Sequence, residues 1–297
     1  MKTNEGAISV AQTHVGVRYF WQLIKPLQTG LLLVTGVTGY LSSRPFPFDG
    51  LEFFILTVSL FCAISGSTIL NMVYDRDIDA RMERTRWRPL VNGLITPSQA
   101  IWMGVAVSAL GIGLATAYNV LYGAIVFLGW FLDVVVYTIW LKRRTPWSIV
   151  WGGLSGGMPI LAGRVLGLGM VDFIGILLAL AILLWIPTHI LTFNMRFFAD
   201  YHRAGIPTFP GRYGFRYTHI LIALSAIGAS GAFFLGCFAL GLAWGYMNVI
   251  LFFALGILTL AIMNIKKQSD HLNFLLFKCA SLFMLVVMIL ISVGSKL

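Results

Sequence analysis

The sequence predicts an all-α membrane protein of nine transmembrane helices around a central cavity, folded as one domain over residues 1–297. Hydrophobic residues make up 58% of the chain and charged residues only 11%, with a mean hydropathy of +0.86. Soluble domains carry roughly 25% charged residues, so these values exclude a soluble core. Residues 1–25 are polar and mixed and lack an apolar run before a cleavage site, so no cleavable signal peptide is expected.

Nine apolar stretches are long enough to span a bilayer, taking roughly 20 residues per helix. A polar segment, residues 1–22, precedes them. The stretches lie near residues 23–42, 51–73, 97–117, 119–141, 148–168, 171–195, 217–240, 242–265 and 273–295. Two helix starts are marked by an N-cap threonine and a proline at the first helical position. These are Thr96-Pro97, with Gln99 at the third position, and Thr145-Pro146.

The distribution of basic residues predicts the orientation. If the N-terminus lies inside, all but three of the 21 Lys and Arg residues fall in segments on the inner side, the exceptions being Arg44, Arg164 and Lys296. Basic residues of membrane proteins collect in cytoplasmic loops, so the loops near 74–96 and 197–216 are expected to be cytoplasmic. The same distribution explains the net charge of +10 without nucleic-acid binding.

The three cysteines indicate neither a disulfide framework nor a metal site. Cys62, Cys237 and Cys279 all lie in apolar stretches and form no CxxC pair. They are expected to be small apolar packing residues.

An acidic cluster follows the second apolar stretch and holds four of the 11 acidic residues. If the helix continues through this cluster, Asn71, Asp75 and Asp79 share one face, with about 6 Å of rise between neighbours. Such hard oxygen ligands suit Mg²⁺, which takes one or two carboxylates and completes its shell with water and substrate phosphates. Carboxylates are rare near membrane segments unless they have a function. The cluster therefore predicts a divalent-cation site at the mouth of a membrane cavity.

Arginines follow these acids directly. Arg84 and Arg88 are four residues apart, on one face if the helix continues to Pro89, which would end it. Guanidinium groups match phosphate oxygens bidentately, so both suit a diphosphate. The alternative is a solvated helix whose acids and arginines only pair with one another. For Asp77, Glu83 and Arg86, the sequence supports this structural alternative and a functional role equally.

A second acidic motif follows the sixth apolar stretch. Asp200 and Arg203 precede a Gly/Pro-rich stretch, 204–214, which is expected to form an ordered loop over the cavity. Asp200 could supply a ligand to a second ion, because both motifs lie on the same side of the membrane. Lys142, about 1.4 turns after Tyr137, could reach a phosphate as a point charge. The alternative for Lys142 is that, like Arg143 and Arg144, it only sets orientation.

Two polar residues lie inside apolar stretches. A lone intramembrane histidine such as His189 is usually a hydrogen-bonded packing residue. The less common alternative is that it contacts a polar or iron-bearing substrate. Asp133 is an intramembrane carboxylate that is expected to face the cavity and pair with a polar group. Some of the aromatic residues are expected to stabilise an allylic carbocation, while most belong to the core and the interfaces.

These motifs resemble the UbiA-type intramembrane prenyltransferases, most closely the branch that farnesylates protoheme IX. The resemblance runs over essentially the whole chain. It rests on the stretches Asp75-Arg-Asp-Ile-Asp79, Tyr137-Thr-Ile-Trp-Leu-Lys-Arg-Arg-Thr-Pro146, Ile149-Val-Trp-Gly-Gly-Leu-Ser-Gly-Gly157 and Asp200-Tyr-His-Arg-Ala-Gly-Ile-Pro207. Lys25-Pro26 and the spacing of Trp185 and His189 also match that branch.

The resemblance implies an enzyme that transfers a farnesyl group from farnesyl diphosphate to a vinyl group of heme B, in the plasma membrane of a prokaryote. It implies Mg²⁺ bound by the metal ligands and catalytic residues Asn71, Asp75, Asp79 and Asp200. The diphosphate would be held by Arg84, Arg88 and Lys142. Candidates for the acceptor side or the cavity wall are Lys25, Asp133, Tyr137, His189, Tyr201 and Arg203.

Two alternatives remain at this point. One is the same chemistry on another acceptor, such as 4-hydroxybenzoate or an archaeal lipid precursor. The other is a cation transporter, against which the many arginines beside the acids argue, because fixed positive charge would block a cation path.

Overall fold

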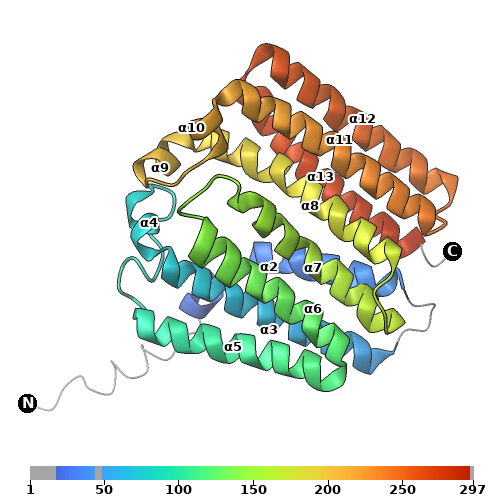
Figure 1. Ribbon diagram of the computed structural model, residues 1–297, viewed down its shortest axis with the longest axis horizontal. Helices are drawn as coiled ribbons and strands as arrows, with labels where there is room; N and C mark the ends of the chain where they lie inside the picture. Colours follow the sequence, from blue (N-terminus) through green and yellow to red (C-terminus); the bar gives the residue numbers. More distant parts are fainter. Residues whose placement is uncertain (1–17, 44–48, 295–297) are drawn as a thin grey trace, which may run out of the picture.

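The computed structural model describes residues 18–43 and 49–294, and all regular secondary structure in these ranges is helical. Most of the polar N-terminal segment lies outside the described residues. The long helices run roughly alongside one another in one bundle, and three short helices gather at one end of it (Figure 1).

The elements, in chain order, are α2 (Pro26–Leu41), α3 (Gly50–Tyr74), α4 (Arg76–Arg81), α5 (Pro97–Tyr118), α6 (Val120–Phe131), the π-helix η1 (Leu132–Leu141), α7 (Ser148–Leu168), α8 (Phe173–Arg196), α9 (Phe198–Arg203), α10 (Phe209–Tyr213), α11 (Phe215–Ala239), α12 (Trp244–Lys267) and α13 (Asp270–Gly294).

Each of the nine predicted stretches holds one long helix, which confirms the fold class. In the described residues, eight helices are long and apolar enough to cross a membrane, counting α6 and η1 as one span. The ninth, α2, has 16 residues because Pro26 occupies its first turn and Lys25 before it is not helical. At 1.5 Å per residue it is about 24 Å long, somewhat shorter than the hydrocarbon core.

One of the two predicted helix starts is confirmed and the other is wrong. Thr96 and Gln99 form a capping box, with Thr96 Oγ1 accepting from Gln99 N at 3.2 Å. Thr145 does not cap α7. Its hydroxyl oxygen accepts from Trp147 N at 3.3 Å in a turn, and the helix starts only at Ser148. A threonine-proline pair specifies a turn here because the chain reverses tightly between η1 and α7.

Glycines bring α2 and α7 into backbone contact. A Cβ atom on Gly163 would lie 2.0 Å from the carbonyl oxygen of Gly36, and one on Gly39 would lie 2.1 Å from that of Ile160. Small residues at helix crossings allow this approach in membranes, where association depends on packing rather than on the hydrophobic effect. The contact fixes the C-terminal half of α2 against α7.

The same end of the bundle carries α4, α9 and α10 (Figure 1). Because the long helices alternate in direction, the segments after α3, η1 and α8 all emerge there. Both acidic motifs and the Lys142 turn are therefore on one side, as the sequence predicts. All three cysteines are free, which agrees with the expected absence of disulfides.

We predict that Gly163→Ala destabilises the protein by about 1–3 kcal/mol, because the new methyl group meets backbone atoms that cannot move aside. Gly256→Ala in α12 is the matched control, since nothing lies within 4 Å of its Cβ position. Thermal unfolding in detergent should show a lower Tm for the first variant only. A Gly163→Ala protein as stable as the control would show that the α2–α7 crossing is looser than described.

Candidate active site

The predicted ladder of oxygen ligands forms, with a bend in it. Helix α3 ends at Tyr74 and α4 starts at Arg76, but the helical hydrogen bonds continue across the join. Asp75 N donates to Asn71 O at 3.0 Å, and Asp79 N donates to Asp75 O at 2.8 Å. The two carboxylates are buried, with exposed fractions of 6% and 5%. They remain about one turn apart on the inner side of the bend.

The prediction of a helix running on to Pro89 is wrong. Helix α4 ends at Arg81, Met82 is extended, and the chain then makes a series of turns. Arg84 and Arg88 therefore do not share a helix face. The chain turns back because Arg88 Nη1 donates to Asp79 Oδ2 at 2.5 Å and Thr85 Oγ1 donates to Asp79 O at 3.0 Å. The free energy gained by pairing the buried Asp79 carboxylate outweighs the free energy gained by continuing the helix.

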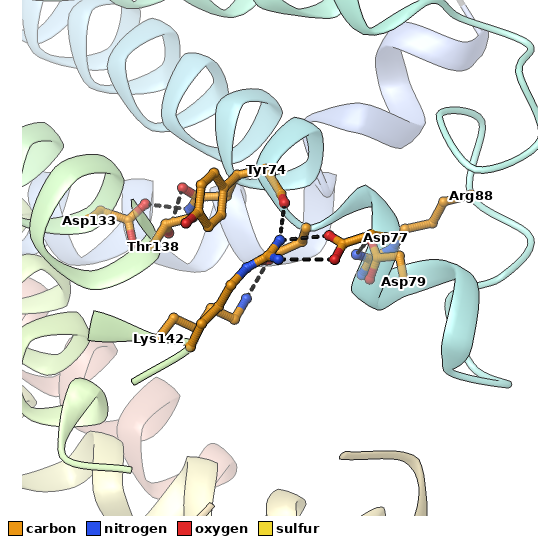
Figure 2. A network of polar contacts seen from close by, with 10 residues as sticks. Tyr74, Asp77, Asp79, Arg88, Asp133, Thr138 and Lys142 are labelled. Atoms are coloured by element: carbon orange, nitrogen blue, oxygen red, sulfur yellow. Dashed lines mark hydrogen bonds and ion pairs between the residues drawn. The ribbon is translucent and has the colours of Figure 1, made fainter. Parts of the chain in front are cut away.

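Each of the two carboxylates is paired with a cation, and Figure 2 labels Asp79 and both cations, Arg88 and Lys142. Lys142 Nζ donates to Asp75 Oδ2, and Arg88 pairs with Asp79. Burial alone lowers the pKa of Lys142, but the attraction of Tyr137 and Asp75 outweighs it, so the pKa lies above its usual value. Lys142 thus stays charged beside Asp75, rather than only setting orientation.

Lys25 completes a group of three cations. It lies within electrostatic range of Arg88 and Lys142 and of both ladder carboxylates. Burial lowers its pKa to about 8, and repulsion by Arg88 and Lys142 lowers it further. Its backbone is left-handed, with φ 46°, a strained conformation for a residue that is not glycine and precedes proline. Such strain is retained mostly at functional sites.

One carboxylate oxygen in this group has no partner. Asp75 Oδ1 is buried and receives no hydrogen bond from any described residue. An orphaned carboxylate oxygen inside a set of hard oxygen donors fits a bound Mg²⁺. Within the described ranges, no three His, Cys, Asp or Glu side chains stand close enough to hold a metal ion by themselves. The described acids thus offer one free carboxylate oxygen and do not enclose an ion by themselves.

The second acidic motif packs against the first. Asp200 is buried, with an exposed fraction of 7%, and Arg203 donates to its Oδ1 at 2.6 Å. Arg203 also reaches Glu83 Oε1, at 3.2 Å, in the first loop. Below these charges, Ile78 and Met82 of the first loop pack with Ala204 and Tyr201 of the second. The two loops close the same end of the bundle as one unit.

Arg84 lies on an aromatic column rather than on the ladder. Its guanidinium stands over the rings of Phe193 and Phe197, at 4.9 and 5.7 Å from their centroids. The same face of α8 continues inward to His189 and Trp185, whose rings stack at 4.8 Å. The four-residue spacing of these rings along α8 places them in one row.

His189 is a packing residue in the described contacts. Its ring also stacks on Phe277 of α13 at 4.5 Å, and Nδ1 is 3.1 Å from Ser281 Oγ. Trp185 Nε1 donates to Ala280 O at 2.8 Å. These contacts join α8 to α13 and give the histidine the hydrogen-bonded role that the sequence favours.

Asp133 has the polar partners that the sequence could not name. Its Oδ2 accepts from Ser67 Oγ and, at 2.8 Å, from Asn71 Nδ2. Thr138 Oγ1 donates to Asn71 Oδ1 at 2.8 Å. Ser67 and Thr138 were missed, although Ser67 is four residues before Asn71 in an otherwise apolar helix.

Arg143 has a role that the sequence reasoning also missed. Its guanidinium binds Asp77 at 2.6 and 2.9 Å and the carbonyl oxygen of Tyr74 at the end of α3 (Figure 2). The hydrogen bond from Arg143 lowers the pKa of Asp77 below its usual value. This pair is exposed and lies outside the group of buried charges, so it supports the bend between α3 and α4.

Comparison with known proteins agrees with this architecture. The model of the UbiA prenyltransferase family matches residues 32–287. A protoheme IX farnesyltransferase of Archaeoglobus fulgidus is 44% identical over 191 residues, which cover 64% of this chain and 66% of that protein. One from Pyrobaculum islandicum is 36% identical and covers 87% of this chain and 93% of that protein.

Solved structures show the same fold. A structure of digeranylgeranylglyceryl phosphate synthase superposes with a TM-score of 0.80 at 19% identity, covering 94% of this chain and 98% of that one. A UbiA homologue from Archaeoglobus fulgidus bound to GPP and Mg²⁺ superposes with a TM-score of 0.71 at 16% identity, covering 93% and 100%. At these identities the likeness concerns the fold alone.

Proposed function

This chain belongs to the UbiA prenyltransferase family and is a membrane-embedded prenyltransferase; we propose that it transfers a farnesyl group from farnesyl diphosphate to a vinyl group of protoheme IX, giving heme O. The relatives named for that reaction support the choice of acceptor. The observation that carries the proposal is the unpartnered Oδ1 of Asp75 among three cations, Lys25, Arg88 and Lys142. A site with surplus positive charge and an orphaned carboxylate oxygen suits a diphosphate with its metal ion.

Asn71, Asp75, Asp79 and Asp200 are the residues that would hold Mg²⁺, directly or through water, because the three acids do not cluster around one point in the described structure. When bound, the ion supplies neutralisation of the diphosphate charge, which makes the diphosphate a better leaving group. A UbiA homologue that binds GPP and Mg²⁺ supports this assignment. Asp200 is paired with Arg203, so we propose that this ion pair loosens when the substrate arrives.

The cations hold the leaving group. Lys142, Arg88 and Lys25 come from the end of η1, the first loop and the start of α2, so they surround the site from three directions. Arg88 offers a planar pair of donors, and the lysines are point charges. Because these groups are fixed before the reaction, they stabilise the negative charge that grows on the diphosphate as the carbon–oxygen bond breaks.

The allylic cation left behind is attacked by the electron-rich vinyl carbon of the heme, and water captures the resulting cation as the hydroxyl group. The aromatic row on α8 and the half-buried Tyr137 offer ring faces for the passing positive charge. We place the active-site loops on the cytoplasmic side of a prokaryotic plasma membrane, where 18 of the 21 basic residues would then lie.

The proposal is tested in membranes that contain the expressed protein, with Mg²⁺, farnesyl diphosphate and heme B, by mass spectrometry of the extracted heme. We expect heme O to form and to disappear with EDTA. Asp75→Ala should lower turnover by at least about 100-fold, since it removes a preorganised charge. Asp77→Ala is the control, because Asp77 is exposed and its ion pair in the described residues is with Arg143, at 2.6 Å. The turnover of this variant should stay within about three-fold of wild type.

Wild-type turnover by Asp75→Ala at unchanged expression would refute the assignment of the site. If diphosphate is released with another aromatic or lipid acceptor and no heme product forms, the assignment as a prenyltransferase stands and heme is rejected as the acceptor. No prenyl chemistry in folded protein would reopen the transporter interpretation.

We also predict a pH dependence from Lys25. Its pKa of about 8 means that the ammonium group loses its proton as the pH rises through that value, and a neutral amine no longer attracts the diphosphate. The KM for farnesyl diphosphate should therefore rise several-fold between about pH 7 and pH 9. Lys25→Arg should remove this rise, because guanidinium stays charged. An identical rise in Lys25→Arg would show that another group titrates.

A further inference from the structure

Asp133 is the acid that lies deepest in the membrane among those described. It stands eight residues from the cytoplasmic end of the span Val120–Leu141, at a depth of about 12 Å. The other described acids lie in loops or in the first turns of helices, such as Glu52 in α3 and Asp270 in α13. An ionisable group at this depth is costly and is a candidate for function.

No cation compensates this charge. The partners of Asp133 are the neutral donors Ser67 and Asn71, both on Oδ2, and in the described part of the chain Asp133 takes part in no salt bridge. This differs from Asp75 and Asp79, which each have a cation. The second oxygen, Oδ1, receives no hydrogen bond from a described residue, and the side chain is half-buried rather than enclosed.

The carboxylate faces the inside of the bundle. Gly129, four residues before it, faces α7, since its Cβ position is 2.9 Å from Met158. Tyr137, four residues after it, also faces α7, with its ring 3.2 Å from the Cβ position of Gly152. The exposed side of this span carries other residues, such as Trp140. Asp133 therefore lies on the side of this span that faces α3 and α7.

Its position relative to the diphosphate residues is set by Asn71. Asn71 binds Asp133 and lies one helical turn, about 6 Å, deeper than Asp75. With the diphosphate held at the level of Asp75 and Lys142, the allylic carbon atoms lie on the membrane side of it, toward Asp133. Tyr137 is within electrostatic range of Asp133, Asp75 and Lys142, which places all four in one region.

We propose that Asp133 is a catalytic residue that stabilises the allylic cation as its counter-charge. The proposal rests on the prenyl transfer proposed above. In that step the bond between C1 of the prenyl chain and the diphosphate oxygen breaks, and its electron pair leaves with the oxygen. C1 and C3 of the chain share the positive charge until the acceptor carbon bonds to C1. The step needs no oxidant and no proton from Asp133.

A fixed carboxylate suits this role. Ser67 and Asn71 hold Oδ2, so the group needs little reorganisation when the positive charge appears. The attraction between charges is stronger in the low-dielectric interior than in water. A cation stabiliser must also be stable without a cationic partner in the resting protein, and the described contacts of Asp133 are with neutral groups. If Asp133 had only a structural role, its negative charge would bring no advantage over a neutral polar group.

The test is Asp133→Asn in the full-length protein, purified in detergent and assayed with Mg²⁺, farnesyl diphosphate and protoheme IX. The amide has the same shape and lacks the charge. We expect kcat to fall by about 100-fold, the effect of removing one preorganised electrostatic contact. The KM for farnesyl diphosphate should change by less than about three-fold, since the diphosphate residues are untouched. The Tm should be equal or higher, because a carboxylate without a cationic partner in a membrane segment is replaced by a neutral amide.

Thr138→Val is the matched control, because it removes a polar contact from the same network and leaves the charge in place. Its loss of kcat should be at least about ten-fold smaller than that of Asp133→Asn. If Asp133→Asn does not fold, Asp133→Glu and Asp133→Gln repeat the comparison, and only the charged variant should retain activity.

A kcat within about three-fold of wild type in Asp133→Asn would overturn the proposal. So would a lower Tm with equal losses in Asp133→Asn and Thr138→Val, which would indicate a structural role. Failure of the underlying function is seen separately, as a wild-type protein that releases no diphosphate with any acceptor.

Discussion

The burial of two carboxylates at the edge of the membrane is the constraint on which the site depends. Asp75 and Asp79 are more than nine-tenths buried, and removing a charge from water costs several kcal/mol unless it is paired. Their partners, Lys142 and Arg88, come from segments 67 and 9 residues away. Pairing them requires the chain to bend at Asp75, to leave the helix after Arg81, and to end η1 beside the ladder. The local backbone follows from electrostatics rather than from helix propensity.

The surrounding parts serve the same group of charges. Lys25, before the first turn of α2, lies near Arg88 and Lys142, where its backbone is strained and its pKa is lowered. Three cations against two carboxylates leave surplus positive charge and one free carboxylate oxygen, and both disfavour the empty site. In the function proposed above, a metal ion with a diphosphate would relieve both. The second loop is joined to the first through Arg203 and Glu83.

The sequence predicted the fold closely, since apolar stretches and membrane thickness determine the number and length of spans almost without tertiary information. It also predicted the ladder, because Asn71, Asp75 and Asp79 are local in sequence. It failed at two helix ends and at the partners of Asp133. Arg88 looked like a helical residue but turns back to Asp79, and Thr145 looked like an N-cap but forms a turn. The partners of Asp133 could not be named because they lie 62 and 66 residues away, on α3.

The central claim is that Asp75 and its cations form the metal-diphosphate site. The most direct measurement is an experimental structure with Mn²⁺ and a non-hydrolysable farnesyl thiodiphosphate, with the metal located by its anomalous scattering. The account predicts a peak at coordination distance from Asp75 Oδ1, with the diphosphate oxygens contacted by Lys142 and Arg88. A metal and diphosphate bound elsewhere, with the ion pairs of Asp75 and Asp79 unchanged, would contradict it.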